Sequence, residues 1–132
     1  MIEDLDILPF PVRTEINKEM PMIASRGCYG NCSFCGIQKF YQKSYGKRAR
    51  VRRRSPQNVV DEILYLVNNY GTKIINFYDD NFEIGTSSGK KWFDEFYSLM
   101  KENNIKVEFY CNLRANEIVK GDYFVEDLSK SD

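Results

Sequence analysis

Residues 28–35 read Cys-Tyr-Gly-Asn-Cys-Ser-Phe-Cys, and this stretch holds three of the four cysteines of the 132-residue chain. Thiolates are soft ligands that suit zinc or iron–sulfur centres. A structural zinc site needs four ligands, usually grouped as CxxC pairs, but the only other cysteine is Cys111 and the chain has no histidine. The CxxxCxxC spacing also differs from that of bacterial ferredoxins. Three thiols without a local fourth ligand therefore indicate a cluster that leaves one iron open.

The even number of cysteines also raises the alternative of two disulfides. A close triplet plus one distant cysteine is not typical of a disulfide framework, and disulfides belong to secreted proteins. The acidic N-terminus does not resemble a signal peptide, and no apolar run approaches the roughly 20 residues that a membrane helix needs. We therefore expect a cytoplasmic protein with free thiols and no membrane span.

The composition is that of a soluble globular domain, with 42% apolar and 29% charged residues. The net charge is zero, but 8 of the 16 residues from Lys39 to Arg54 are basic and none is acidic. This stretch also contains the aromatic residues Phe40, Tyr41 and Tyr45. It is either a loop that precedes the first helix or a surface that contacts nucleic acid through phosphates and bases.

Apolar periodicity and turn residues predict alternating strands and helices. Ser55 and Pro56 are typical of a helix start and Gly71 of a helix end. Prolines at positions 9 and 11 predict an extended, non-helical segment. In chain order, we expect a linker over 1–20, a strand over 21–25, a helix over 56–69 and a strand over 73–78. A core helix follows, with its apolar stripe over 92–100 and its end at 103–104, and then a strand over 105–111 and a short helix over 122–129.

This alternation predicts an α/β fold with a parallel sheet. In such sheets, ligands gather at the carboxyl ends of the strands. Those ends are the cysteine stretch, residues 79–82 and residues 112–114. We therefore expect these three segments to form one site.

Taken together, these motifs resemble those of the radical S-adenosylmethionine (radical SAM) superfamily, which has CxxxCxxC after the first strand and an aromatic residue, here Phe34, before the last cysteine. The resemblance covers roughly residues 5 to 130. Its cobalamin-associated branch is similar in further segments, which are residues 25–28, 52–56, 59–63, 79–82 and 113–115. Residues 8–11 resemble the segment that joins a cobalamin-binding domain to the catalytic barrel in that branch.

The resemblance implies a TIM-like partial (β/α) barrel with about three βα units, which is half of the six-unit radical SAM barrel. Residues 1–20 would then be a linker from an N-terminal domain, and 21–132 the N-terminal half of the catalytic domain. We expect a truncated chain that alone is inactive or only weakly active. Its exposed sheet edges favour a homo-oligomer.

The resemblance also implies a cofactor set. Cys28, Cys32 and Cys35 would bind three irons of a 4Fe-4S cluster, and SAM would chelate the fourth. An electron from a donor such as flavodoxin or ferredoxin would cleave SAM to methionine and a 5′-deoxyadenosyl radical, so the cofactors carry the chemistry. Cobalamin would be held by a domain absent from this chain. The substrate, whether a small molecule or a macromolecule, is not indicated.

Five residues are candidates for contacts with SAM. Phe34 would lie against the adenine, or else belong to the core. Asp79, Asp80 and Asn81 stand where many family members have Gly-Gly-Glu, so a carboxylate would face the SAM ammonium group. The alternative is that these residues form an Asx turn that closes the strand. A magnesium site at the acidic pair is only weakly indicated. Arg114 would bind the SAM carboxylate or form a surface ion pair. No further catalytic residue is identified.

Two functions thus remain open from the sequence. The first is a radical SAM enzyme, or its cluster-bearing half. The second is a non-catalytic module, either a zinc-loaded or metal-free half domain or a binder of nucleic acid through the basic residues 39–54.

Overall fold

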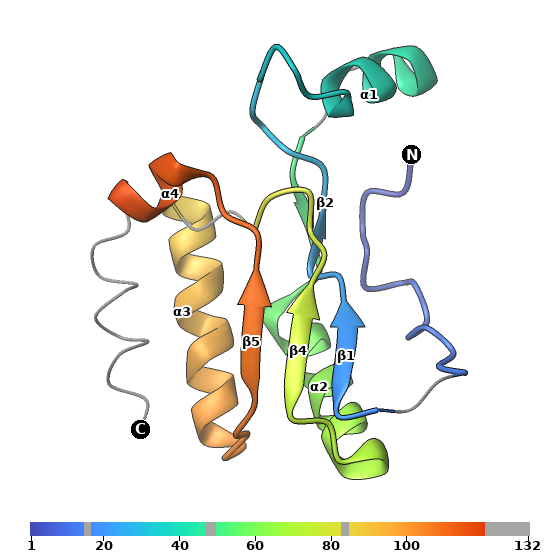
Figure 1. The fold of residues 1–132 in the computed structure, drawn as a ribbon, viewed down its shortest axis with the longest axis vertical. Coiled ribbons are helices and arrows are strands. Elements are labelled where there is room, and N and C mark those ends of the chain that lie inside the picture. The colour runs from blue at the N-terminus through green and yellow to red at the C-terminus, as the bar shows by residue number, and fades with distance from the viewer. Residues whose placement is uncertain (15–16, 47–49, 83–84, 121–132) are drawn as a thin grey trace.

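The computed structural model describes residues 1–14, 17–46, 50–82 and 85–120. Strands and helices alternate along most of the chain, as the apolar periodicity predicted (Figure 1). In chain order, the elements are β1 (Glu19–Met22), β2 (Ser25–Arg26), α1 (Ile37–Tyr45), β3 (Arg52–Arg53), α2 (Pro56–Tyr70), β4 (Ile74–Phe77), α3 (Ser87–Glu102), β5 (Glu108–Cys111) and α4 (Ala115–Lys120).

The main sheet is parallel and has the strand order β1–β4–β5. Met20 lies opposite Ile75, which in turn lies opposite Phe109. The helices between these strands, α2 and α3, cover the same face of the sheet (Figure 1). Spatial order therefore follows chain order with both helices on one side, which is consistent with the first units of a TIM-like barrel.

The hydrophobic core lies between the sheet and these two helices. Alternate strand residues point into it, since side chains of a strand alternate between its two faces. The rings of Trp92 and Phe96 stack with centroids 5.4 Å apart, which confirms the predicted core face of α3. The fully buried residues of the core include Met20, Val59, Val60, Ile63, Leu66, Ile75, Phe77 and Phe96.

Helix α2 begins and ends at the residues that the sequence indicated. The Ser55 hydroxyl accepts a hydrogen bond from the Asn58 N–H at 3.1 Å, which satisfies one free donor of the first turn. Gly71 ends the helix with φ 64°, a left-handed conformation that favours glycine. The prediction for 56–69 is confirmed, with one more residue at the end of the helix.

The single strand predicted over 21–25 is wrong, because two short strands occupy this region. β1 ends at Met22, and β2 pairs antiparallel with β3 instead of joining the main sheet. The change occurs at Ala24, whose N–H donates to the Asp79 carboxylate at 3.1 Å. A backbone donor bound to a side chain is not available to a strand ladder, so the chain leaves the sheet there.

The basic stretch 39–54 is not simply a loop, since it contains most of α1 and all of β3. Helix α1 has no side-chain cap at its start, and among its residues only Gln38 and Tyr41 are buried. It therefore lacks the apolar stripe that reveals a helix in a sequence. The helix predicted over 122–129 lies outside the described residues, and α4 precedes it.

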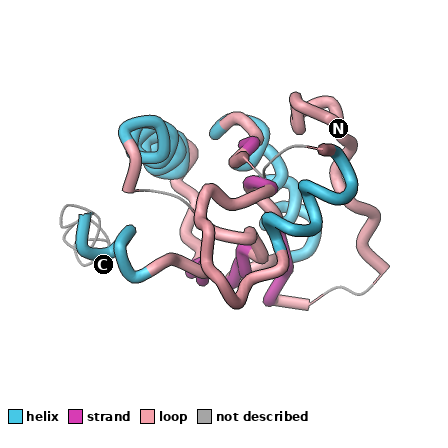
Figure 2. The backbone as a smooth tube through the Cα atoms, turned by 90° about the horizontal axis from the view of Figure 1, so that it is seen from above, coloured by secondary structure: helices cyan, strands magenta, loops and turns pink. Residues whose placement is uncertain are grey.

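The described residues 1–14 contain neither helix nor strand, as the prolines predicted. We call them the N-terminal segment; that they form a linker stays a prediction. The segment packs on the domain through the buried side chain of Leu5 and through Asp6, which accepts a hydrogen bond from the Ser55 N–H at 2.9 Å. Figures 1 and 2 show it passing beside β1.

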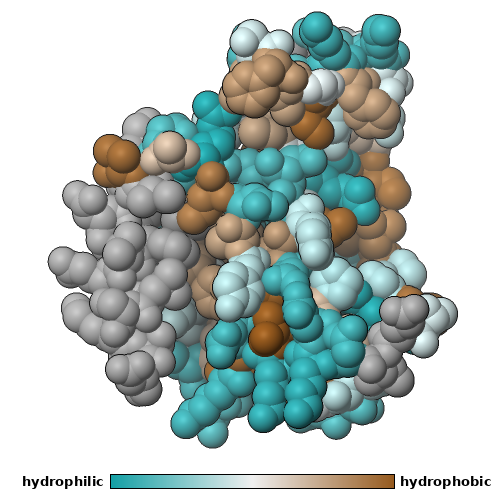
Figure 3. Space-filling model, viewed as in Figure 1, coloured by the Kyte–Doolittle hydropathy of each residue, from teal (hydrophilic) through white to brown (hydrophobic). Residues whose placement is uncertain are grey.

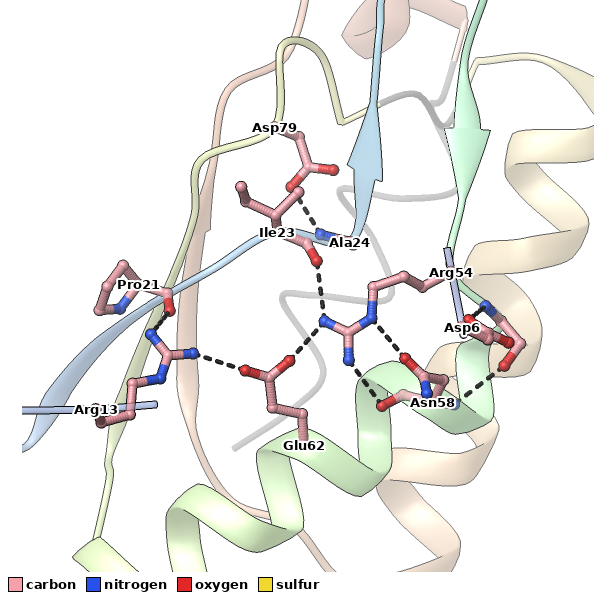
Figure 4. Close-up of polar contacts among 10 residues, drawn as sticks. Asp6, Arg13, Pro21, Ile23, Ala24, Arg54, Asn58, Glu62 and Asp79 are labelled. Atoms are coloured by element: carbon pink, nitrogen blue, oxygen red, sulfur yellow. Dashed lines mark hydrogen bonds and ion pairs between the residues drawn. The ribbon is translucent and has the colours of Figure 1, made fainter. Parts of the chain in front are cut away.

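Two arginines cap the outer edge of β1 (Figure 4). Arg13 donates to the Pro21 carbonyl and to the Glu62 carboxylate, both at 2.6 Å. Arg54 donates to the Ile23 carbonyl at 3.0 Å and to Glu62 at 2.5 Å. Glu62 is 1% exposed, so this Arg13–Glu62–Arg54 triad is a buried ion network that joins the N-terminal segment, β1 and α2.

Candidate functional site

Three segments meet at the carboxyl end of the sheet, and they are the three that the sequence analysis indicated. Residues 28–35, the cysteine loop, lie between β2 and α1. The segment after β4 and the segment after β5 lie beside this loop, at the upper end of the sheet in Figure 1. The contacts between them join residues distant in sequence, and Arg114 and Cys32 are more than 80 positions apart.

The four cysteines are free thiols, and the three in the cysteine loop are partly exposed. The loop is shaped by its own backbone and by one helix residue. The Cys28 sulfur accepts a hydrogen bond from the Gly30 N–H at 3.3 Å. The buried Gln38 amide, in the first turn of α1, donates to the Cys28 carbonyl at 2.7 Å and to the Gly30 carbonyl at 3.0 Å. The sequence analysis did not identify Gln38, because its role depends on a helix that was not predicted.

The donor chemistry of the cysteine loop suits an iron–sulfur cluster. Three free thiols on one short loop are available, and thiolates favour such clusters. Within the described part of the chain, no three cysteine or acidic side chains are grouped closely enough to bind a metal ion as they stand. Phe34, beside the last of these cysteines, is 90% exposed, so its ring is accessible at the surface of the site.

Arg114 reaches from the end of β5 to the cysteine loop. Its guanidinium donates to the Cys32 sulfur at 3.1 Å and lies over the Tyr29 ring, 5.4 Å from the centroid. It also passes directly over Gly30, where a Cβ atom would be 1.8 Å from the Arg114 Nη1 atom. The contact with Cys32 raises the pKa of Arg114, so this side chain is a fixed positive charge beside two of the three thiols.

Residues 79–81 form hydrogen bonds that join the segment after β4 to the residues before the cysteine loop and to Arg114. The buried Asp79 carboxylate accepts hydrogen bonds from the Ala24 N–H and the Ser25 hydroxyl, so both its oxygens are engaged within the chain. Burial raises the pKa of Asp79. The exposed Asp80 accepts from the Gly27 N–H at 2.9 Å. That either carboxylate contacts SAM stays a prediction.

Asn81 joins the segments that follow β4 and β5. Its side-chain oxygen accepts a hydrogen bond from the Arg114 N–H at 3.1 Å. The next residue, Phe82, donates its N–H to the Asn112 carbonyl at 2.9 Å. The Asn81 amide nitrogen is buried and has no hydrogen-bond partner among the described residues. Asn81 therefore positions Arg114 and retains a donor at the site.

Glu117 of α4 connects all three segments, although the sequence analysis did not single it out. Its buried carboxylate accepts hydrogen bonds from the Tyr29 hydroxyl in the cysteine loop and from the Gly85 N–H after β4. Asn116 also donates to the Tyr29 hydroxyl, at 3.2 Å. Partial burial and the Glu117 carboxylate raise the pKa of Tyr29, which keeps the phenol a hydrogen-bond donor. No sequence pattern marks a carboxylate that becomes buried in this way.

Comparison with known proteins identifies the family. The model described as the radical SAM superfamily matches residues 22–130, which is most of the chain. The chain belongs to the radical SAM superfamily. The three-cysteine motif, its place at the carboxyl end of the sheet and the α/β fold agree with this assignment.

Several curated proteins are similar to this radical SAM chain. Cytidylyl-2-hydroxyethylphosphonate methyltransferase from Streptomyces wedmorensis is 30% identical over 114 residues, which cover 73% of this chain and 20% of the relative. Anaerobic magnesium-protoporphyrin IX monomethyl ester cyclase from Synechocystis is 30% identical over 96 residues, covering 73% and 17%. An uncharacterized methyltransferase from Pyrococcus horikoshii is 30% identical over 95 residues, covering 72% and 18%.

The chain therefore spans about one fifth of the length of these radical SAM relatives, or less. No solved structure matched the chain significantly. Among the described residues, no helix combines the length and the apolar character needed to cross a membrane.

Cys111, the thiol outside the radical SAM motif, belongs to the core. It packs against the hydrophobic cluster under the sheet. Burial raises its pKa to about 11, so it is a protonated thiol at neutral pH. A buried thiol whose pKa is raised in this way is a poor metal ligand.

Arginines of the basic stretch make contacts within the chain. Arg50 pairs with Glu3, and Arg52 donates to the Ile2 carbonyl and, at 2.9 Å, to the Tyr41 hydroxyl. Arg54 belongs to the buried triad. These contacts hold the N-terminal segment on the domain, and nucleic-acid binding by residues 39–54 stays a prediction.

Proposed function

We propose that this chain is the cluster-bearing part of an enzyme that binds a 4Fe-4S cluster and SAM and cleaves SAM reductively to a 5′-deoxyadenosyl radical. The observation that supports this most is the CxxxCxxC motif, which presents three free, partly exposed thiols at the carboxyl end of a parallel sheet in a radical SAM chain. The cluster, when bound, supplies the electron for this cleavage.

Cys28, Cys32 and Cys35 would hold the cluster, leaving one iron for SAM. Arg114 would bind the SAM carboxylate, because its planar guanidinium suits a carboxylate and already lies beside the Cys32 sulfur. The exposed Phe34 ring would cover the adenine. Asp80 and the free donor of Asn81 are the further polar groups of the same edge, whereas Asp79 is engaged in the fold.

The outcome of the reaction differs among the relatives, since their names describe two methyltransferases and a cyclase. The substrate and any use of cobalamin would depend on regions of such proteins that lie beyond the part this chain matches. The proposal therefore covers SAM cleavage and leaves the substrate unassigned.

Anaerobic reconstitution with iron and sulfide tests the cluster. We expect a brown protein with about four irons per chain and broad absorbance in the blue, as for a four-iron cluster bound by cysteine thiolates. Cys32→Ala should lose the absorbance, whereas Cys111→Ala should keep it. Stoichiometric zinc without iron, or equal absorbance in both variants, would contradict the proposal and favour the non-catalytic module.

Binding of SAM to the reconstituted protein tests Arg114. Arg114→Lys keeps the charge but loses the two-pronged geometry, so we expect it to weaken SAM binding by roughly tenfold, the effect of about one charge-assisted hydrogen bond. Iron content should stay near four per chain, which separates SAM binding from cluster assembly. Unchanged SAM affinity in this variant would remove Arg114 from the proposed site.

A further inference from the structure

A cavity of about 360 Å³ lies between the N-terminal segment and the outer edge of β1, away from the cysteine thiols. Leu8, Phe10 and Pro11 line it on the side of the segment, and Met22 and Ile23 on the side of the sheet. Its walls are mainly apolar, and its volume is within the range of small-molecule sites in proteins. None of the roles described above uses this cavity.

The side chains that line the cavity include more positive than negative charges. Arg13, Arg26 and Arg54 line it together with a single acid, Glu62. The side chains of Arg13, Arg54 and Glu62 are only 10%, 11% and 2% exposed, so the triad carries an excess positive charge that is largely buried. The Phe10 ring, 5.5 Å from the Arg54 guanidinium, offsets part of that charge. A buried excess cation favours an anion nearby.

Two donors at this cavity are unused. The Nε atom of Arg13 is buried and has no hydrogen-bond partner among the described residues. Arg26 lines the cavity from β2, and within the described ranges no side chain forms a hydrogen bond or ion pair with its guanidinium. A free guanidinium fork suits a carboxylate, phosphate or sulfonate group.

We propose that this cavity binds a small organic anion with an apolar body. The anionic group would pair with Arg26 within the positive field of the triad, and the apolar body would contact Leu8, Phe10 and Ile23. Binding at this position requires neither cluster nor SAM, since no cysteine and none of the proposed SAM contacts lines the cavity. The inference is therefore independent of the proposed function.

Fluorescence titration of the cluster-free chain with 8-anilinonaphthalene-1-sulfonate tests the proposal, because this probe combines an apolar body with a sulfonate. We expect saturable binding at one site. Arg26→Gln should weaken binding roughly tenfold, the effect of losing one charge-assisted hydrogen bond. Lys91→Gln removes the same charge from the exposed surface of α3 and should leave binding unchanged.

Two further arms separate the apolar contribution from the ionic one. Leu8→Trp fills the cavity from its rim and should abolish binding, with the fold checked by circular dichroism. The uncharged analogue N-phenyl-1-naphthylamine should bind more weakly, with the same affinity for wild type and Arg26→Gln. No saturable binding to wild type, equal losses in the Arg26 and Lys91 variants, or full binding by Leu8→Trp would overturn the proposal.

Discussion

Asp79 and Glu117 are buried carboxylates that each accept hydrogen bonds from two groups distant in sequence. Asp79 holds the turn between β1 and β2, and Glu117 holds the cysteine loop against the segment after β4. A buried carboxylate is stable only when it is hydrogen-bonded, so each fixes the groups that it contacts. The sequence analysis assigned Asp79 to SAM and did not single out Glu117, because burial cannot be read from a lone acidic residue.

Replacing Asp79 should destabilise the fold. Asp79→Ala leaves the Ala24 N–H and the Ser25 hydroxyl buried without their acceptor, and each unsatisfied group costs about 1–3 kcal/mol. We therefore expect the free energy of unfolding in urea to fall by about 2–4 kcal/mol. Asp61→Ala, on the exposed face of α2, is the control and should change it little. A loss of similar size in both variants would contradict this role.

The raised pKa of Asp79 also predicts a pH dependence. Because burial raises this pKa in the folded state, the folded protein binds the proton more tightly than the unfolded chain does. The stabilisation is complete below the unfolded pKa and is lost as the pH rises through the folded pKa. Relative to Asp79→Asn, wild type should therefore gain stability as the pH falls through the raised folded-state pKa toward the ordinary range of an aspartate. An opposite slope would show that hydrogen bonds outweigh burial here.

The contact between Tyr29 and Glu117 predicts how accessible the thiols are. Tyr29→Phe removes the hydroxyl that joins the cysteine loop to α4, so the loop should open more often. We expect alkylation of the cluster-free loop cysteines by iodoacetamide to become severalfold faster, followed by mass spectrometry. Tyr45→Phe, which loses an exposed hydroxyl on α1, should not change the rate. Equal rates in all three proteins would exclude a positioning role for Tyr29.

Among the elements, α2 is the one whose start depends most clearly on a single side chain. Ser55→Ala removes the hydroxyl that accepts the Asn58 N–H, and we expect a loss of about 1 kcal/mol in the free energy of unfolding. Ser98→Ala places alanine at an exposed position within α3 and should be neutral or slightly stabilising. Equal stability of wild type and Ser55→Ala would mean that water replaces the cap.

The helices and strands that the sequence predicted correctly are those marked by local patterns. Helix α2 was predicted because an apolar stripe and local caps agreed, and α3 because its apolar residues recur at helical spacing. Helix α1 was missed because its buried face is made by Gln38 and Tyr41, which give no apolar period. The division of 21–25 into two strands depends on Asp79, more than 50 residues away, and local patterns contain no such information.

In the candidate site, too, the sequence predicted the arrangement of the segments better than the contacts between their side chains. Parallel topology predicted that three strand-end segments would meet, and they do. Which side chains join them was only partly predictable: Arg114 was identified, whereas Gln38, Tyr29 and Glu117 were not. Their roles arise from packing between distant segments. The polar, open face of the sheet in Figure 3 likewise follows from strand alternation.

For the whole molecule, the triad is a buried ionic connection between the N-terminal segment and the domain. Glu62→Gln would leave Arg13 and Arg54 buried without their shared counter-charge, which typically costs about 3–5 kcal/mol. We expect a matching fall in the free energy of unfolding and faster tryptic cleavage at Arg13. Glu95→Gln, on the exposed face of α3, is the matched control. Unchanged cleavage at Arg13 would show that other contacts hold the segment.

The capped edge of β1 has a consequence for how the chain behaves at high concentration. An uncovered strand edge can template cross-β growth by recruiting the backbone of another molecule. On β1 this is blocked chemically, since Pro21 lacks an N–H and the carbonyls of Pro21 and Ile23 are bound to guanidinium groups. Clipping the chain before β1 would remove Arg13 and return the Pro21 carbonyl to solvent. Proteolysis at that point would therefore leave part of this strand edge available for pairing with another chain.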